Sequence, residues 1–189
     1  MTRQSALAGA ARGNTPARYG AVAICFHWLL ALALTASFSL GVYMADLPFS
    51  PQRVRLYNWH KWTGITILAF SLARLLWRLW RPPALVEMPR WQRIAASATH
   101  AAMYLLFFAV PLAGWAYSSA TGFPVVVYGI LPLPEFVPVD KALAEVLKQR
   151  HGNLAWLLAV LVVLHVAAAL KHHFVDRDQL LLRMWPRWR

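Results

Sequence analysis

The chain has 189 residues, of which 59% are hydrophobic and 14% charged, and its formal net charge is +12. This much apolar surface excludes a soluble domain of this size, and the apolar stretches are long enough to cross a bilayer. The basic residues separate apolar runs, so they act as topology signals and do not indicate a nucleic-acid partner. The single cysteine, Cys25, excludes a disulfide within one chain, and no Cys-x-x-Cys-His motif for covalent haem attachment is present.

Four segments are predicted to cross the membrane as helices, because each is long, largely apolar and bounded by basic or proline-containing links. The sequence therefore predicts an all-α membrane protein, an up-down four-helix transmembrane bundle over residues 19–176 with tails at 1–18 and 177–189. Pro111 is expected to kink the third helix. The predicted spans cover residues 21–44, 58–80, 94–119 and 151–175.

The link between the third and fourth spans has an unusual composition. Residues 121–139 are apolar but contain four prolines, so they are too interrupted for a spanning helix. We expect them to pack as a cap over one end of the bundle. Asp140 is predicted to N-cap a short amphipathic helix over 141–150, which either abuts the fourth span or continues into it.

The distribution of basic residues predicts the orientation. Four spans place both termini on one side of the membrane. That side carries three Arg in the N-terminal tail, five in the second link with its helix ends, and five Lys or Arg from Lys171 onward. The other side carries five Lys or Arg, plus Lys61. Because basic residues concentrate in cytoplasmic loops, both termini are predicted to be cytoplasmic.

A 14-residue interval recurs in all four predicted spans. In the fourth, an uncharged run separates His151 from His165. On a helix this interval is about 21 Å of rise and about 1400° of turn, so the two side chains share a face at two depths. Taken alone, the pair is equally compatible with two unrelated histidines, one at the interface and one buried. The same interval joins His27 to Gly41, His60 to Arg74 and His100 to Gly114, which divides the bundle into two layers.

Ionisable residues inside membrane spans are costly and indicate function. Neutral imidazole is a standard axial ligand of haem iron, and two imidazoles from different helices can bind one haem. Counting from the helix ends pairs His60 with His151 in the outer, periplasmic layer, and His27 with His165 in the inner layer. These four histidines are the predicted metal ligands of two haems, which bind without covalent attachment.

Three further residues are predicted to contact the haems. Gly41 and Gly114 lie at the depth of the outer layer, where a missing side chain lets a flat ring approach the backbone. Close packing between membrane helices explains such glycines equally well. Arg74 lies at the depth of the inner layer, where a haem propionate would neutralise it. The alternative is an Arg side chain that extends along its methylene stem to the cytoplasmic interface.

The remaining histidines lie toward the cytoplasmic side. His100 is expected to be packed and hydrogen-bonded beside the inner haem, because two other histidines already fill the axial positions of that iron. His172 and His173 are either a solvated helix end or a proton source for a bound quinone, whose reduction takes two protons and two electrons. The candidate quinone residues, neighbours by depth, are His172, Lys171, His100 and Tyr104.

Most of the motifs around the histidines, and one near the end of the chain, form a recognisable set. They are Phe26-His27-Trp28, Trp59-His60-Lys61-Trp62-Thr63-Gly64, His100-Ala-Ala-Met-Tyr104, Leu164-His165 through Lys171-His172-His173, and Leu182-Arg183-Met184. This set resembles the bacterial cytochrome b561 family, including its superoxide oxidase member, and more distantly the cytochrome b subunit of nickel-iron hydrogenase. The resemblance runs from about Tyr19 to Pro186. It implies two b-type haems ligated by the four paired histidines, and electron exchange with ubiquinone in the bacterial inner membrane.

The resemblance implies an oxidoreductase that passes electrons from periplasmic superoxide to ubiquinone. The basic residues near the outer layer would attract an anionic substrate, although they would equally neutralise haem propionates. The alternative function is an electron-transfer subunit that links a partner dehydrogenase, hydrogenase or cytochrome c to the quinone pool. A third alternative is a structural haem-binding subunit. The basic residues are Arg53, Arg55, Lys61, Lys148 and Arg150.

Overall fold

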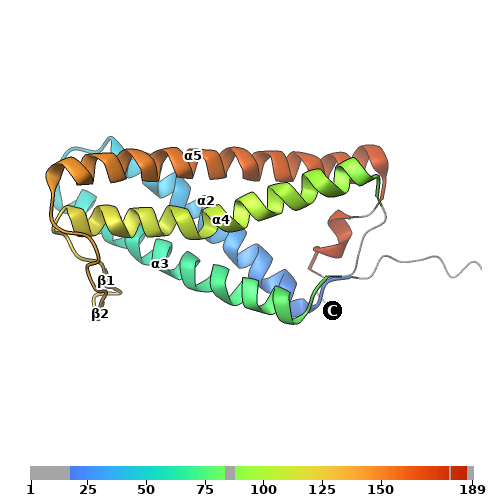
Figure 1. Cartoon of the computed structure of the whole chain (residues 1–189), viewed down its shortest axis with the longest axis horizontal. Helices are drawn as coiled ribbons and strands as arrows, with labels where there is room; N and C mark the ends of the chain where they lie inside the picture. Colours follow the sequence, from blue (N-terminus) through green and yellow to red (C-terminus); the bar gives the residue numbers. More distant parts are fainter. Residues whose placement is uncertain (1–17, 84–87, 179, 187–189) are drawn as a thin grey trace, which may run out of the picture.

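The computed structural model describes residues 18–83, 88–178 and 180–186. Within these residues the chain is helical, apart from one short hairpin, and its four long helices lie side by side with successive helices running in opposite directions (Figure 1). The long helices are α2 (Ala21–Ala45), α3 (Pro51–Trp80), α4 (Arg90–Ala120) and α5 (Lys141–Lys171).

The starts of two helices follow from their capping residues. The Ser50 side chain accepts a hydrogen bond from Arg53 N at 3.2 Å, and Pro51 occupies the first turn of α3. The Asp140 carboxylate accepts from Leu143 N at 3.0 Å, which confirms the predicted N-cap. The amphipathic stretch after Asp140 continues into the apolar run, so α5 is a single helix of 31 residues.

Three helices of the described chain are long and apolar enough to cross a membrane: α2, α4 and α5 with its last turn. Large apolar side chains on them face outward, among them Leu32 at 67%, Leu105 at 71% and Val163 at 66% exposure, as expected of a surface covered by lipid. The segment predicted as the second span forms α3, which fails this composition test although it has 30 residues.

The polar residues of α3 explain why its composition differs. At its first half, the hairpin of β1 (Val126–Val127) and β2 (Leu131–Pro132) covers a polar stripe. Trp62 Nε1 donates to Val126 O at 2.7 Å, and the Thr66 and Tyr128 hydroxyls lie 2.6 Å apart. Lys61 Nζ donates to Phe123 O at 3.0 Å. Since the hairpin satisfies these groups, α3 does not need an apolar surface along this flank.

The hairpin itself is small. Strands β1 (Val126–Val127) and β2 (Leu131–Pro132) are antiparallel, with Val127 opposite Leu131. The turn between them has positive φ at Tyr128 (53°) and Gly129 (73°). The proline-rich link predicted as a cap over one end therefore packs at that end and along the flank of α3. We call this end of the molecule the hairpin end.

The helices associate mainly as two pairs, α2 with α3 and α4 with α5. Four buried apolar side chains form a core cluster between α4 and α5. Across the two pairs, Phe38 of α2 and Trp156 of α5 meet edge to face with ring centres 5.0 Å apart. The core cluster consists of Met103, Leu106, Phe107 and Leu158.

Both ends of the described chain meet at the opposite end of the molecule, which we call the terminal end (Figure 1). After α5, a π-helical turn η1 (His172–Asp176) and a short 3-10 helix η2 (Leu181–Arg183) fold the chain back against the start of α2. Trp28 Nε1 donates to Met184 O at 2.8 Å. The residues after 176, predicted as a tail, thus pack on the bundle as far as they are described.

Candidate functional site

At the hairpin end, His60 of α3 and His151 of α5 face each other. Their ring centres are 6.0 Å apart, and the ring planes are nearly perpendicular at 86°. The two histidines come from different helix pairs, so the space between their rings lies between those pairs.

At the terminal end, His27 of α2 and His165 of α5 form a second facing pair. Their ring centres are 6.3 Å apart with planes tilted by 57°. His151 and His165 are on the same helix, and their 14-residue separation corresponds to about 21 Å of rise. The structure therefore brings together both pairs that the spacing predicted, at two depths.

The separation within each pair suits a shared metal ion. A metal–imidazole bond is about 2 Å long, so two imidazoles on opposite sides of one ion have ring centres about 6 Å apart. Both pairs meet this condition. Paired neutral imidazoles, without cysteine or carboxylate, are residues that would suit a haem iron.

The backbone of a neighbouring helix orients each ring at the hairpin end. His60 Nδ1 lies 3.1 Å from Ser37 O of α2, and His151 Nδ1 lies 3.0 Å from Val110 O of α4. A carbonyl oxygen only accepts, so Nδ1 carries the proton in both rings. Nε2 of each neutral ring is then left with its lone pair, as metal binding requires.

The two predicted glycines lie against these same rings. A Cβ added at Gly41 would be 3.1 Å from His60 Cε1, and one added at Gly114 would be 3.0 Å from His151 Cε1. Each glycine follows the acceptor carbonyl by four residues, Ser37 before Gly41 and Val110 before Gly114. The close approach that requires glycine is thus made by the histidine ring itself.

The contacts differ at the terminal end. Arg74 Nη2 lies 3.2 Å from His27 Nδ1. A guanidinium only donates, so His27 Nδ1 accepts here and the ring proton is on Nε2. Among the described residues, no hydrogen bond reaches the His165 ring; its neighbours are His27 and His100, whose ring centre is 5.3 Å away.

Comparison with known proteins assigns most of the chain to one family. The family model for prokaryotic cytochrome b561 matches residues 18–187. Cytochrome b561 homolog 2 of Escherichia coli K12 is 38% identical over 174 residues, 90% of this chain and 93% of that protein. The chain belongs to the prokaryotic cytochrome b561 family.

Two further relatives have comparable coverage. The probable superoxide oxidase CybB of Yersinia pestis is 33% identical over 91% of this chain and 98% of its own length. Cytochrome b561 homolog 1 of Escherichia coli K12 is 29% identical over 90% of this chain and 98% of its own length. This cytochrome is therefore a multi-pass bacterial membrane protein of electron transport that binds b-type haem.

The four residues predicted for quinone binding fall into two groups in this b561 protein. Tyr104 and His100 lie with the terminal-end pair, and the Arg74 guanidinium is 5.7 Å from the centre of the Tyr104 ring. Lys171 and His172 lie at the end of α5. Within the described chain, no hydrogen bond or ring contact connects the two groups.

Two aspartates, Asp176 and Asp178, pair with the side chains of Lys171 and His172. Lys171 Nζ is 2.7 Å from Asp176 Oδ2, and His172 Nδ1 is 3.1 Å from the same oxygen and close to Asp178 Oδ2. The π-helical turn at 172–176 brings these side chains together. The contact of Asp178 with His172 follows the left-handed residue Arg177, with φ 54°, which helical periodicity does not predict.

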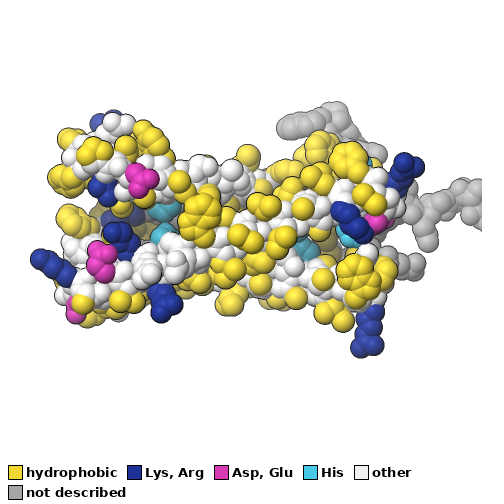
Figure 2. Space-filling view, turned by 90° about the horizontal axis from the view of Figure 1, so that it is seen from above, with side chains coloured by type: hydrophobic (Ala, Val, Ile, Leu, Met, Phe, Trp, Pro, Cys, Tyr) yellow, Lys and Arg dark blue, Asp and Glu magenta, His cyan; other side chains and the backbone are white. Residues whose placement is uncertain are grey.

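The basic residues at the hairpin end differ in their contacts with other residues. Lys61 donates to Phe123 O, and the Arg53 guanidinium hydrogen-bonds to Tyr57 Oη at 3.2 Å. Lys148 is 3.6 Å from Glu145, while Arg55 and Arg150 are exposed. Figure 2 shows Lys and Arg side chains gathered toward both ends of the long axis, with apolar side chains between them.

Proposed function

We propose that this cytochrome binds two b-type haems, one held by His60 and His151 and the other by His27 and His165. The observation that carries the proposal is the pair of imidazole separations, 6.0 Å and 6.3 Å, at two depths of one bundle. Haem b supplies reversible one-electron transfer at its iron. The protein's own part is to fix the four rings and to keep their surroundings apolar.

We infer an orientation with the terminal end in the cytoplasm and the hairpin end in the periplasm. The positive-inside count supports it, because most Lys and Arg residues lie at the terminal end. The hairpin end is then the donor side, and the terminal end is the side of quinone reduction.

The proposed donor is superoxide, and the proposed acceptor is ubiquinone. Two superoxide anions are oxidised to two molecules of dioxygen, and one ubiquinone takes up the two electrons with two protons. The exposed Arg55 and Arg150 side chains would raise the local concentration of an anion at the hairpin end. At the terminal end, His172 with its two aspartates would hold protons for the quinone. The similarity to a probable superoxide oxidase supports this reading.

A second function is supported by a different observation. The hairpin presents apolar side chains to the outside, with Ile130 84% and Leu131 59% exposed. Such a surface suits a protein partner at the donor side. The chain would then pass electrons between that partner, a dehydrogenase, a hydrogenase or cytochrome c, and the quinone pool.

Stopped-flow spectroscopy separates the two functions. The purified holoprotein in detergent is mixed with a superoxide source, and reduction of the haem α band is recorded with and without ubiquinone. For a superoxide oxidase we expect rapid reduction that slows with salt and is abolished by superoxide dismutase, followed by reoxidation when ubiquinone is present. Haems that remain oxidised under superoxide would contradict the first function and favour a partner protein as donor.

A further inference from the structure

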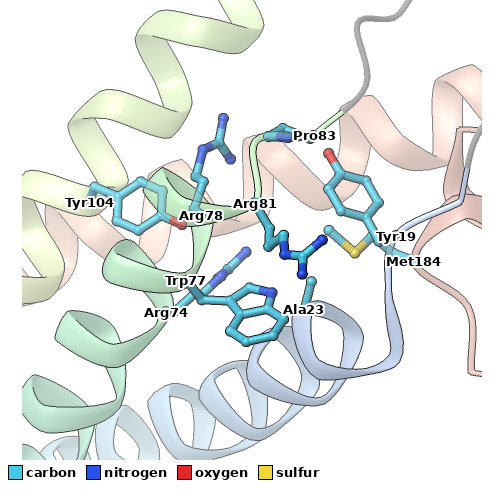
Figure 3. Close-up of a pocket in the computed structure, with 9 residues that line it drawn as sticks. All are labelled: Tyr19, Ala23, Arg74, Trp77, Arg78, Arg81, Pro83, Tyr104 and Met184. Atoms are coloured by element: carbon cyan, nitrogen blue, oxygen red, sulfur yellow. The ribbon is translucent and has the colours of Figure 1, made fainter.

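Three arginines line one pocket at the terminal end. Arg74, Arg78 and Arg81 are spaced by four and three residues, so they lie along one face of α3 and its C-cap. The pocket is partly open to the outside, and the three arginine side chains line it together (Figure 3). The rest of its lining is Tyr19, Ala23, Trp77, Pro83, Tyr104 and Met184.

Two of these guanidiniums have no anionic partner in the described chain. Arg78 lies 5.8 Å from the centre of the Tyr104 ring, and Arg81 lies 4.8 Å from that of Trp80. These contacts are made with aromatic rings and do not neutralise the charge, so the guanidinium N–H groups remain able to donate to an anion. Within the described chain, neither side chain forms an ion pair, and no acid lines the pocket. Arg74 differs, because it already donates to His27.

The depth of the pocket is that of the lipid headgroups. Arg81 is the residue that ends α3, about 10 Å further along the axis than Arg74. Exposed tryptophans, Trp80 at 66% and Trp91 at 68%, lie at the same end of the helices, as is typical of a membrane–water interface.

We propose that Arg78 and Arg81 bind the phosphate of an anionic phospholipid from the leaflet at the terminal end. The planar guanidinium forks match phosphate oxygens, and basic pockets between membrane helices bind anionic headgroups. The unpaired charge of the two arginines is thereby neutralised at the depth where lipid phosphates lie. Arg74 is left for the terminal-end pair.

Native mass spectrometry of the delipidated holoprotein tests this proposal. The probes are phosphatidylglycerol and phosphatidylcholine with identical chains, with inorganic phosphate as competitor. We expect one phosphatidylglycerol per chain, preferred over phosphatidylcholine and not displaced by millimolar phosphate. In the double variant Arg78→Gln/Arg81→Gln the affinity falls about tenfold to a hundredfold. The matched control Arg90→Gln/Arg93→Gln removes two exposed charges near the start of α4, outside the pocket, and retains wild-type binding.

Three outcomes would overturn the proposal. Equal binding of the two lipids would mean that the site does not select an anion. Displacement by inorganic phosphate would identify free phosphate as the ligand. Loss of haem from the Gln variant, with lipid binding unchanged, would show that the two arginines neutralise haem propionates. The variant Arg78→Lys/Arg81→Lys keeps the charges but not the forks, so we expect intermediate affinity from it even if the Gln variant fails to fold.

Discussion

The two histidine pairs are held in different ways. At the hairpin end, both rings donate to backbone carbonyls of the adjacent helix, Ser37 O and Val110 O. At the terminal end, His27 accepts from the side chain of Arg74, and no hydrogen bond reaches His165 within the described chain. Backbone carbonyls fix the tautomer that leaves Nε2 able to bind metal, whereas Arg74 favours the opposite tautomer.

This difference indicates that the two sites form differently. At the hairpin end, backbone carbonyls of the adjacent helices already hold both rings in the tautomer that the proposed haem needs. At the terminal end, His27 can carry its proton on Nδ1 only when the Arg74 guanidinium leaves that atom. The guanidinium then needs another acceptor, such as a propionate carboxylate. We therefore expect substitutions near Arg74 to act on one haem only, and substitutions near the two glycines to act on the other.

Removing a ligand gives the largest expected effect. His151→Ala and His165→Ala should each lower the haem content from two per chain to one, because each leaves one imidazole without its partner. Pyridine haemochrome absorbance divided by protein concentration measures the content. His173→Ala, at a histidine outside both pairs, is the control and should retain two haems. Two haems in either of the first variants would refute the ligand assignment.

The second-largest effect is expected from adding a side chain beside the His60 or His151 ring. In Gly114→Ala the new Cβ would lie 3.0 Å from His151 Cε1, and in Gly41→Ala 3.1 Å from His60 Cε1, so the ring must shift. Overpacking of this kind costs about 1–3 kcal/mol, and if that cost falls on the haem-bound state, haem binding weakens about fivefold to 150-fold.

The same helices provide matched controls for the glycine variants. A Cβ at Gly64 of α3 or Gly152 of α5 would have no atom within 4 Å, so Ala there should be neutral or raise helix stability. Thermal loss of Soret absorbance compares all four variants. Equal haem retention in Gly114→Ala and Gly152→Ala would show that the close approach to His151 is not required.

Substitution of Arg74 should affect the other pair. Arg74→Gln removes the cation beside His27, so we expect the terminal-end haem to be retained about tenfold to a hundredfold less tightly while the hairpin-end haem is unchanged. Redox titration of the α band follows the two haems as two components. It shows whether the terminal-end component is lost while the hairpin-end component keeps its midpoint potential. A variant in which both components change equally would contradict the independence of the two pairs.

The helices and the two depths of the histidines could be predicted from the sequence. The 14-residue interval placed His151 and His165 at two depths because the helix period is fixed, and the uncharged runs indicated the helices. The carbonyls of Ser37 and Val110 could not be singled out, since every residue has one. The available signal was the glycine four residues later, which was interpreted as space for the haem and in the structure faces a histidine ring.

Other features depend on contacts between distant segments. The proline-rich link was predicted to be non-helical, but strands of two residues, such as Val126–Val127, are too short to show an alternating pattern. The polar stripe of α3 gave no indication of its partner, because Thr66 meets Tyr128 only after the chain has returned through α4. The pairing of His172 with Asp178 likewise depends on a π-helical turn that the periodicity of α5 does not predict.

The smallest expected effect tests whether backbone or side chain orients His60. The Ser37 hydroxyl is 3.3 Å from His60 Nδ1 and the Ser37 carbonyl is 3.1 Å from it, so the ring has two candidate partners on one residue. Ser37→Ala removes only the hydroxyl. If the carbonyl accepts the Nδ1 proton, the variant keeps the tautomer and both haems, and stability falls by no more than about 1 kcal/mol. A midpoint shift of the hairpin-end component, or loss of its haem alone, would instead identify the hydroxyl as the acceptor. The backbone-held description would then remain valid for His151 alone.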